Sequence, residues 1–420
     1  MLDLTILACI ALGFFLGIIS GLTPGLHLNN FAAMLLAVSP QLLNWGLTPF
    51  EMSSIILSAS ISQTFFDAIP AVFLGAPDSE MALTVLPGQR LMLEGRGIEA
   101  VRLSALGSAG SVLFALLLIA PLSWTVFNYY DYLTKYVGVL LLAIAIMMIR
   151  SEMGPQIDGQ GSWVHYKYKA LAGLLFLTSG LLGVFAFERE GLATSPLGLE
   201  PQVLLPLLSG IFGASSLLIS LSARTEIALQ RESEIHLSAA ALAKAVFSGS
   251  LGGSVVAWIP GVSPSVAAIT ARLGSAPSPE EFLISIAGVN TANALFSLVA
   301  LYVIDRPRSG AAAAIQELMD LDQNDLMQMV IIVIMVASAS YLACIAAARL
   351  AGRAITRLNY RLLCLVVLVF LVAMSYAFTG LFGLFIFFLS TVVGLIAPVA
   401  GIHRTHAMGV LMLPLIVRYI

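Results

Sequence analysis

Two short stretches place polar and helix-breaking residues next to strongly apolar sequence. Residues 23–30 read TPGLHLNN and residues 259–266 read IPGVSPSV, and each follows a long apolar run. Proline ends a helix, and glycine permits a turn. A helix that restarts after such a break has unpaired N–H groups and a positive dipole end, which together bind an anion. Both stretches therefore predict a half-helix start that could bind a carboxylate or a phosphate.

The small polar residues around these breaks are the candidate anion ligands, because they can hydrogen-bond an anion without filling a cavity. They are Thr23, Gly25, His27, Asn29, Asn30, Gln63, Thr64 and Ser79 in the first region, and Gly261, Ser263, Ser265, Asn290, Thr291, Asn293 and Ser309 in the second. The asparagines could instead only hold spans together, and Ser79 and Ser309 could cap helices. Arg306 and Arg308 could clamp the anion or anchor a loop at the membrane surface.

His27 and Asp67 are ionisable residues within the first region. An ionisable group inside a membrane costs about 2.5–3.5 kcal/mol on insertion scales, which indicates a function. Histidine titrates near neutral pH. We therefore predict that His27, Asp67 or both couple the protein to protons or sodium ions. A neutral His27 bonded to a carbonyl group, and an Asp67 that caps a helix or pairs with a basic group, are the alternatives.

The composition is that of a membrane protein. Of the 420 residues, 59% are hydrophobic and 10% are charged, whereas soluble domains carry about 25% charged residues. Runs long enough to span a bilayer lie at about 4–21, 99–123, 133–150, 170–187, 203–222, 236–258, 327–348, 362–378 and 381–398, with a shorter run at 405–418. The regions 23–95 and 260–320 are apolar but interrupted, and we do not expect ordinary paired spans there.

Several residue types predict no chemistry of their own. Residues 1–3 lack the basic start of a cleavable signal peptide. Cys9, Cys344 and Cys364 lie in or beside apolar runs and are expected to be buried packing residues. We find no catalytic motif and no metal-ligand spacing, so we expect no enzyme activity, no bound metal and no cofactor beyond a coupling ion.

Basic residues predict the orientation of the chain. A stripe of four arginines, which contains no acidic residue, follows one span; it consists of Arg349, Arg353, Arg357 and Arg361. The positive-inside rule places this stripe in the cytoplasm and, walking back along the spans, the amino terminus outside. We therefore expect a multi-pass protein of the cell membrane. The stripe could bind lipid headgroups or, less simply, a phosphate.

The two broken regions resemble each other. Pro24 and Gly25 align with Pro260 and Gly261, and the glycines at 13 and 17 align with those at 249 and 253. SASISQT at 58–64 resembles SIAGVNT at 285–291 after a gap, and GAPDSEMAL at 75–83 resembles DRPRSGAAA at 305–313. The predicted orientations of the two copies are opposite. Inverted repeats with broken helices are typical of secondary transporters.

The expected fold is therefore an all-α polytopic membrane protein with two inverted repeats, about ten spans and re-entrant segments. The first repeat covers 1–150 with its broken region at 23–95, and a linker with connecting spans covers 151–235. The second repeat covers 236–348 with its broken region at 260–320, and the last spans lie in 349–420. The sequence leaves a homodimer open.

The stretches SGLTPGLHLNNFAAMLL, GAPDSEMALTVLPGQR, IPGVSPSVAA and GVNTANALFSLVALYVIDRPRSGAAAA make the chain resemble the large membrane subunit of the tripartite tricarboxylate transporters. The resemblance implies a permease for small carboxylates, driven by a cation gradient. It also implies a small membrane subunit and an extracytoplasmic binding protein as partners. The chain departs from the family at residues 305–308, where Asp-Arg-Pro-Arg replaces small residues.

Two other functions stay open at this point. The half-helix starts and the arginines could serve a transporter or flippase of a lipid-linked phosphate, such as a polyprenyl phosphate. An intramembrane enzyme would need a catalytic pair, for which Asp67 and Asp305 are the candidates, although neither lies in a catalytic motif.

Overall fold

The computed structural model describes the whole chain except residues 1–2, 24–31, 33–34, 37–38, 40, 76–84, 153–162, 197, 199–200, 202, 223–227, 236, 259–266, 268–277 and 356–358. Within the described part every regular element is helical, and nine helices are long and apolar enough to cross a membrane. The all-helical polytopic fold predicted from the sequence is therefore confirmed.

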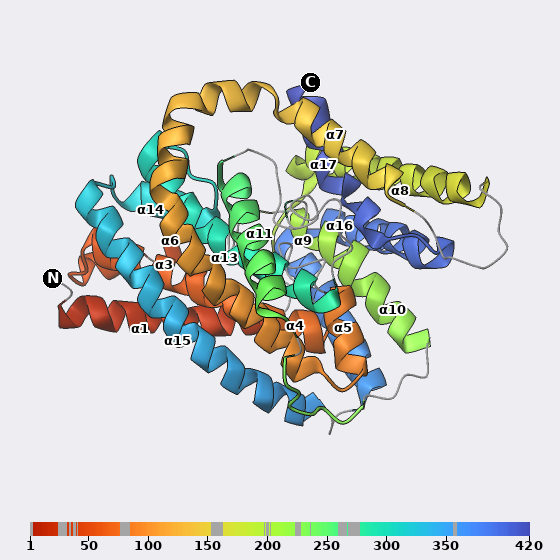
Figure 1. Ribbon diagram of the computed structural model, residues 1–420, viewed down its shortest axis with the longest axis horizontal. Helices are drawn as coiled ribbons and strands as arrows, with labels where there is room; N and C mark the ends of the chain where they lie inside the picture. The colour runs from red at the N-terminus through yellow and green to blue at the C-terminus, as the bar shows by residue number, and fades with distance from the viewer. Residues whose placement is uncertain are drawn as a thin grey trace.

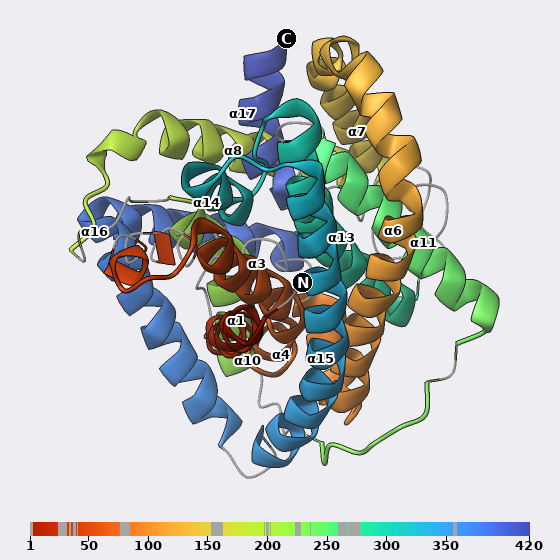
Figure 2. The ribbon, with the colours of Figure 1, turned by 90° about the vertical axis from the view of Figure 1, so that its left-hand side faces the viewer.

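The helices form two packed groups (Figures 1 and 2). The first contains α1 (Leu4–Leu22), α3 (Pro49–Phe66), α4 (Ala68–Phe73), α5 (Val85–Leu93), α6 (Gly97–Lys135), α11 (Ala239–Trp258), α13 (Pro279–Ile304), α14 (Gly310–Leu318) and α15 (Gln323–Ile355). The second contains α7 (Val137–Arg150), α8 (Trp163–Glu188), α9 (Leu204–Leu208), the π-helical turn η3 (Ser209–Ala214), α10 (Ser215–Ser222), α16 (Tyr360–Ala400), the 3₁₀ turn η4 (Arg404–Met408) and α17 (Gly409–Tyr419). A further 3₁₀ turn, η2, covers Glu190–Leu192.

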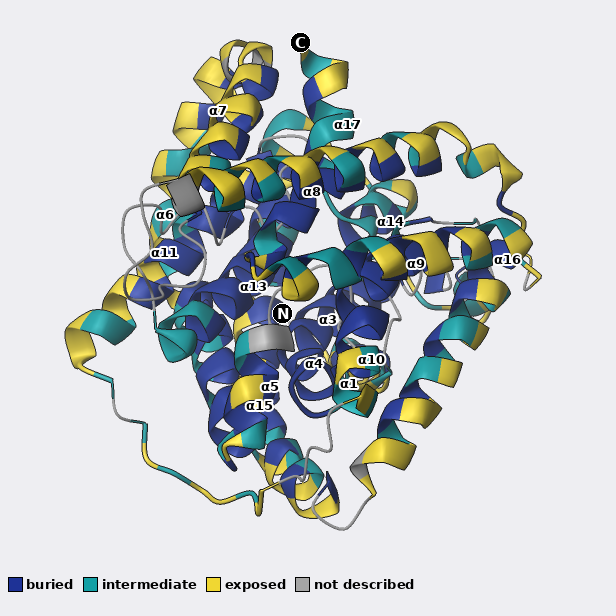
Figure 3. Ribbon diagram, turned by 90° about the vertical axis from the view of Figure 1, so that its right-hand side faces the viewer, coloured by how far each residue is buried: buried dark blue, intermediate teal, exposed yellow. Residues whose placement is uncertain are grey.

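The outer helices present apolar side chains to the surroundings. Phe15 of α1, Leu181 of α8 and Leu381 of α16 are each more than half exposed. The same helices turn buried residues towards the centre (Figure 3). A surface of this kind needs an apolar solvent, as expected for helices that face lipid.

The centre of the first group holds two helices that the sequence analysis did not predict as spans. The stretch Pro49–Phe73 is 100% buried over its most apolar window, and Pro279–Ile304 is 94% buried, against 39% for α1. The expectation that neither broken region contains an ordinary span was therefore wrong for these two stretches. Both stretches are apolar enough to cross a membrane, but proline, glycine, asparagine and aspartate interrupt the regions around them, which is why the sequence suggested broken segments.

The two central helices begin in the same way. Thr48 caps α3, with its Oγ1 accepting the Glu51 N–H at 3.2 Å, and Pro49 is the first helical residue. Ser278 caps α13 in the same way, and its Oγ accepts the Glu281 N–H at 3.2 Å before an equivalent proline. Serine or threonine, proline and a glutamate three residues after the cap form a strong helix-start signal.

Equivalent glycines let the outer helix of each pair approach its central helix. A Cβ on Gly17 of α1 would lie 2.4 Å from the carbonyl oxygen of Ala59, and one on Gly253 of α11 would lie 2.7 Å from that of Val289. These contacts make Ala59 and Val289 equivalent, whereas the sequence alignment pairs Ala59 with Ile286. The predicted pairing of 58–64 with 285–291 is thus displaced by about one helical turn, and the shared helix starts agree with the new register.

The central helices also end alike. Gly75 follows α4 with φ of +64°, and Asp305 follows α13 with φ of +51°. The alignment of 75–83 with 305–313 pairs these two positions. Asp305 is the sole non-glycine residue of the described part with a positive φ, and aspartate tolerates this left-handed conformation better than most residues.

The two predicted spans at 362–378 and 381–398 are joined directly in α16. Gly380, with φ 64° and ψ −152°, breaks the helical path, and the two parts meet at an angle (Figure 2). All three cysteines are buried and none forms a disulfide within the described residues, which confirms their predicted packing role.

Candidate substrate and coupling site

A buried polar contact joins the two central helices. Asn290 of α13 donates its Nδ2 to Oδ2 of Asp67 at 2.8 Å, and the Thr291 hydroxyl donates to that of Thr64 at 3.0 Å. All four residues are at most 3% exposed. The two contacts show that the end of α3 meets the middle of α13 at this point.

Further polar pairs surround this crossing. The Ser20 hydroxyl of α1 donates to Oε1 of Gln63 at 2.8 Å. The Ser108 hydroxyl of α6 lies 3.3 Å from the carbonyl oxygen of Ala287. On α13, Ser297 donates to Oδ1 of Asn293 at 3.3 Å. The predicted ligands Gln63, Thr64, Asn290, Thr291 and Asn293 thus lie on the two central helices, at or near their crossing.

Local sequence places Asp67 at a discontinuity. Pro70 has no N–H to donate to the carbonyl group of Phe66, so the helix is interrupted between α3 and α4. Asp67 is the cap residue shared by the two segments. Its carboxylate points to α13, where it accepts a hydrogen bond from the amide of Asn290.

The chemistry of the crossing suits a small cation. Oδ1 of Asn290 is buried with no hydrogen-bond partner among the described residues. This carbonyl oxygen, the Asp67 carboxylate and two threonine hydroxyls are oxygen donors, which hard cations prefer.

Much of the predicted anion site cannot be placed. Gly25, His27, Asn29, Asn30, Ser79, Gly261, Ser263 and Ser265 lie outside the described residues. The structure does place the preceding helix ends: α1 stops at Leu22 and α11 stops at Trp258, each just before its proline-containing stretch. Thr23 caps α1 and donates its hydroxyl to the carbonyl group of Ile19 at 2.7 Å.

Arg306 and Arg308 lie at the far end of α13 and contact Tyr130 of α6. Their guanidinium carbons are 5.3 and 5.7 Å from the centre of the Tyr130 ring, and Arg308 also hydrogen-bonds the Tyr130 hydroxyl. Ile304, the last residue of α13, lies about 21 Å along the helix from Asn290, and both arginines follow it. These contacts fit the alternative of a loop anchor. Ser309 caps α14 by accepting the Ala312 N–H at 3.2 Å, which fits its capping alternative.

The proposed aspartyl pair of an intramembrane enzyme does not form. Asp305 accepts from Nε2 of Gln316 at 2.9 Å at the end of α13, whereas Asp67 is held by Asn290 within the span. With a rise of about 1.5 Å per residue, Asp305 lies about 22 Å along the helix from Asn290. This separation is too large for two carboxylates to share a proton.

Comparison with known proteins places the chain in a family. A profile of the Tripartite tricarboxylate transporter TctA family matches residues 7–409. The chain is a member of this family. It is also 24% identical to an uncharacterized protein of Methanocaldococcus jannaschii over 423 residues, which covers 97% of this chain and 98% of that protein. No solved structure matches.

TctA membership confirms the family predicted from the sequence and makes the chain a transporter component of a tricarboxylate transport system. Because such a system is tripartite, it implies partner subunits. The helices long enough to cross a membrane agree with a multi-pass transporter.

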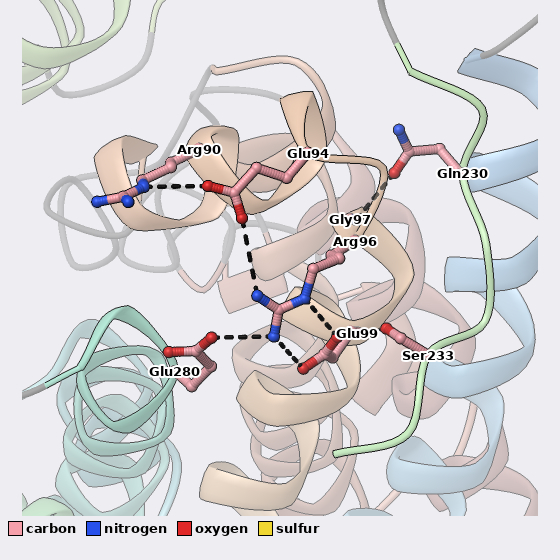
Figure 4. A network of polar contacts seen from close by, with 8 residues as sticks. All are labelled: Arg90, Glu94, Arg96, Gly97, Glu99, Gln230, Ser233 and Glu280. Carbon is pink, nitrogen blue, oxygen red and sulfur yellow. Dashed lines mark hydrogen bonds and ion pairs between the residues drawn. The ribbon is translucent and has the colours of Figure 1, made fainter. Parts of the chain in front are cut away.

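An ion-pair network in this TctA chain connects the turn between α5 and α6 to the start of α13 (Figure 4). Arg96 donates its Nε and Nη2 to Glu99 at 2.9 and 2.7 Å, and its Nη2 also contacts Glu280 of α13 at 2.9 Å. The hydrogen bonds from Glu99 raise the pKa of Arg96 further above its usual value. Gln230 accepts the Gly97 N–H at 2.8 Å, so the extended segment before α11 packs on the same end.

The arginine stripe contacts this segment as well. Arg349 forms an ion pair with Glu232 at 2.9 Å, and both side chains are about half exposed. An exposed, paired arginine does not favour the reading of the stripe as a phosphate site. Arg357 lies outside the described residues.

Sequence reasoning missed a buried arginine of this TctA chain. Arg404, in η4, is 7% exposed and donates its Nη1 to the hydroxyls of Ser215 and Ser216. Burial lowers the pKa of Arg404 to about 10. Its serine partners follow the π-helical turn η3, a type of distortion found often at functional sites. Arg404 lies far from these serines along the chain, so no local sequence pattern predicts their contact.

Proposed function

We propose that this chain is a secondary active permease for a small organic anion, most simply a carboxylate, driven by a proton or sodium gradient. The observation that carries the proposal is the buried contact of Asp67 with Asn290 where α3–α4 and α13 cross. TctA membership supports the substrate class. A carboxylate that is buried between two halves of a transporter is well placed to sense a coupling ion.

The proposal includes two inverted repeats, one on each side of this crossing. Three matched features support it: capped helix starts before Pro49 and Pro279, glycine contacts of Gly17 and Gly253, and positive-φ ends after α4 and α13. One repeat could then rock against the other to open the site to alternate sides.

The anion would bind between the two half-helix starts. In this proposal Gly25, Asn29 and Asn30 of the first copy face Ser263 and Ser265 of the second. Their N–H groups and small side chains would hold a carboxylate close to the polar residues of the crossing. His27, which aligns with Ser263, would give the two halves different roles.

The proposed setting is a cell membrane, with the amino terminus outside and the 349–361 segment in the cytoplasm. The proposed partners are a small membrane subunit and an extracytoplasmic binding protein, as a tripartite family suggests. The binding protein would deliver the anion, and this chain would carry it across the bilayer.

Proteoliposomes test this function. The chain, reconstituted with its small membrane subunit, should accumulate a radiolabelled di- or tricarboxylate when an inward proton or sodium gradient is imposed. The purified chain should also gain thermal stability in the presence of that carboxylate. Absence of both uptake and stabilisation across a broad carboxylate panel would overturn the proposed substrate class.

A further inference from the structure

A histidine–carboxylate cluster lies apart from the helix crossing, in the second group of helices. Glu152 follows the end of α7, and His403 and His406 lie in the turn between α16 and α17. Oε2 of Glu152 is 2.9 Å from Nδ1 of His403 and 2.9 Å from Nε2 of His406. The ligand atoms of all three residues lie within 4.8 Å of one another.

The spacing of these atoms is close to what a tetrahedral metal ion requires. Ligand atoms about 2.0–2.2 Å from a tetrahedral zinc ion lie about 3.3–3.6 Å apart. The two nitrogen–oxygen distances of 2.9 Å would have to open by about half an ångström, which small side-chain rotations supply. No backbone rearrangement is required.

The surroundings of the cluster orient its carboxylate. The main-chain N–H of His403 donates to the same Oε2 at 3.0 Å, so the carboxylate is held by the loop that supplies both histidines. Outer hydrogen bonds of this kind fix the direction of metal ligands. The Glu152 side chain is buried, and such a carboxylate is most stable beside a cation.

The cluster is accessible to an ion from one side. His406 is 2% exposed, whereas 73% of the His403 side chain is exposed, so the cluster opens to its surroundings on one side. Nδ1 of His406 has no hydrogen-bond partner among the described residues. One of the two nitrogens of this buried ring is therefore not engaged in hydrogen bonding with the described residues.

We propose that Glu152, His403 and His406 bind a divalent ion of the zinc class. Two imidazoles and one carboxylate form the donor set of many three-ligand zinc sites, in which water occupies the fourth position. Magnesium and calcium prefer oxygen ligands, so the two nitrogen donors disfavour them. The ion would connect the end of α7 to the α16–α17 turn, and this site is independent of the proposed transport chemistry.

Metal titration of the purified full-length chain tests the site. After treatment with a chelator, the protein should bind one Zn²⁺ per chain at pH 7.5 by calorimetry. Co²⁺ should give the visible absorption bands of a tetrahedral nitrogen–oxygen site. Bound zinc should also raise the unfolding temperature.

Variants connect the binding to these residues. Glu152→Gln and His406→Ala should each weaken zinc binding by at least about ten-fold, whereas Glu317→Gln, a change at an exposed glutamate of α14, should leave it unchanged. Size-exclusion profiles matched to the parent protein would show that each variant is folded. Absence of stoichiometric zinc binding by the parent protein, or equal binding by folded His406→Ala and parent, would overturn the proposal and leave a hydrogen-bonded cluster.

Discussion

Replacement of Asp67 by asparagine should separate transport from stability. Asparagine at this position keeps an oxygen that accepts from Nδ2 of Asn290, and it keeps nearly the same volume, so the crossing should persist. What the variant loses is the negative charge and the proton that the carboxylate can carry. If Asp67 binds the coupling ion, the gradient should no longer drive uptake.

The substitution Asp67→Asn changes the free energy of unfolding in two ways, and these have opposite signs. Removing a charge from the membrane interior relieves up to about 2.5–3.5 kcal/mol. Loss of a charge-assisted hydrogen bond in favour of a neutral one costs about 1 kcal/mol. Asp67→Asn should therefore be as stable as the parent or more stable by up to about 2 kcal/mol. Gradient-driven uptake should fall by about a hundred-fold, the equivalent of about 2.8 kcal/mol.

Paired measurements check both halves of this prediction. Uptake is compared with and without an imposed proton or sodium gradient, and thermal unfolding is followed in the same detergent. Asp305→Asn is the matched control, because Asp305 is exposed and bonded to Gln316 at the end of α13, and it should change neither quantity. Undiminished gradient dependence in folded Asp67→Asn would refute the coupling role, and a loss of stability of several kcal/mol would refute the electrostatic reasoning.

Two further changes test the packing and the ion-pair network. Arg96→Gln should destabilise the protein by about 3 kcal/mol because it removes the ion pair of the buried Glu99. Glu280→Gln should lower the free energy of unfolding by less, because Arg96 keeps its ion pair with Glu99. Chemical unfolding should therefore find Arg96→Gln less stable than Glu280→Gln. Gly253→Ala should cost about 1–3 kcal/mol, because the added Cβ would lie 2.5 Å from that of Ala292. Gly191→Ala, with no atom within 4 Å, is the control, and equal melting temperatures for both glycine variants would contradict the close packing of α11 on α13.

The helix crossing was partly visible in the sequence. The alignment of the two broken regions selected Thr64, Asn290 and Thr291, and Asp67 was selected because it is ionisable. The structure brings these four residues together in two contacting pairs. The sequence alignment of α3 with α13 differed by about one helical turn from the match that the glycine contacts give, because serine- and alanine-rich segments match each other at several offsets. The glycine contacts resolved the register, since backbone approach tolerates no such shift.

Other contacts had no sequence signal. Glu152 and His406 are 254 residues apart, and Arg96 and Glu280 are 184 apart, so no local spacing could predict either pair. Arg306 and Arg308 looked like an anion clamp because of their charge and their neighbouring proline. Their positions against Tyr130 follow from how α6 packs beside the end of α13.

The sequence alone determined the class of the protein and its family. A composition with 10% charged residues requires an apolar solvent, and backbone hydrogen bonding in that solvent requires helices. Helix ends are also local, so Pro24 and Pro260 mark the ends of α1 and α11, and Thr48 and Ser278 mark the starts of the central helices.

The tertiary structure decided which helices are enclosed and which polar groups meet. Hydropathy reports the average preference of a segment for lipid, so it does not distinguish a span that neighbouring helices enclose from one that faces lipid. The burial of Pro49–Phe73 and Pro279–Ile304 depends on α1, α6, α11 and α15 packing around them. The contact between Asp67 and Asn290 exists only because that packing crosses two segments more than two hundred residues apart.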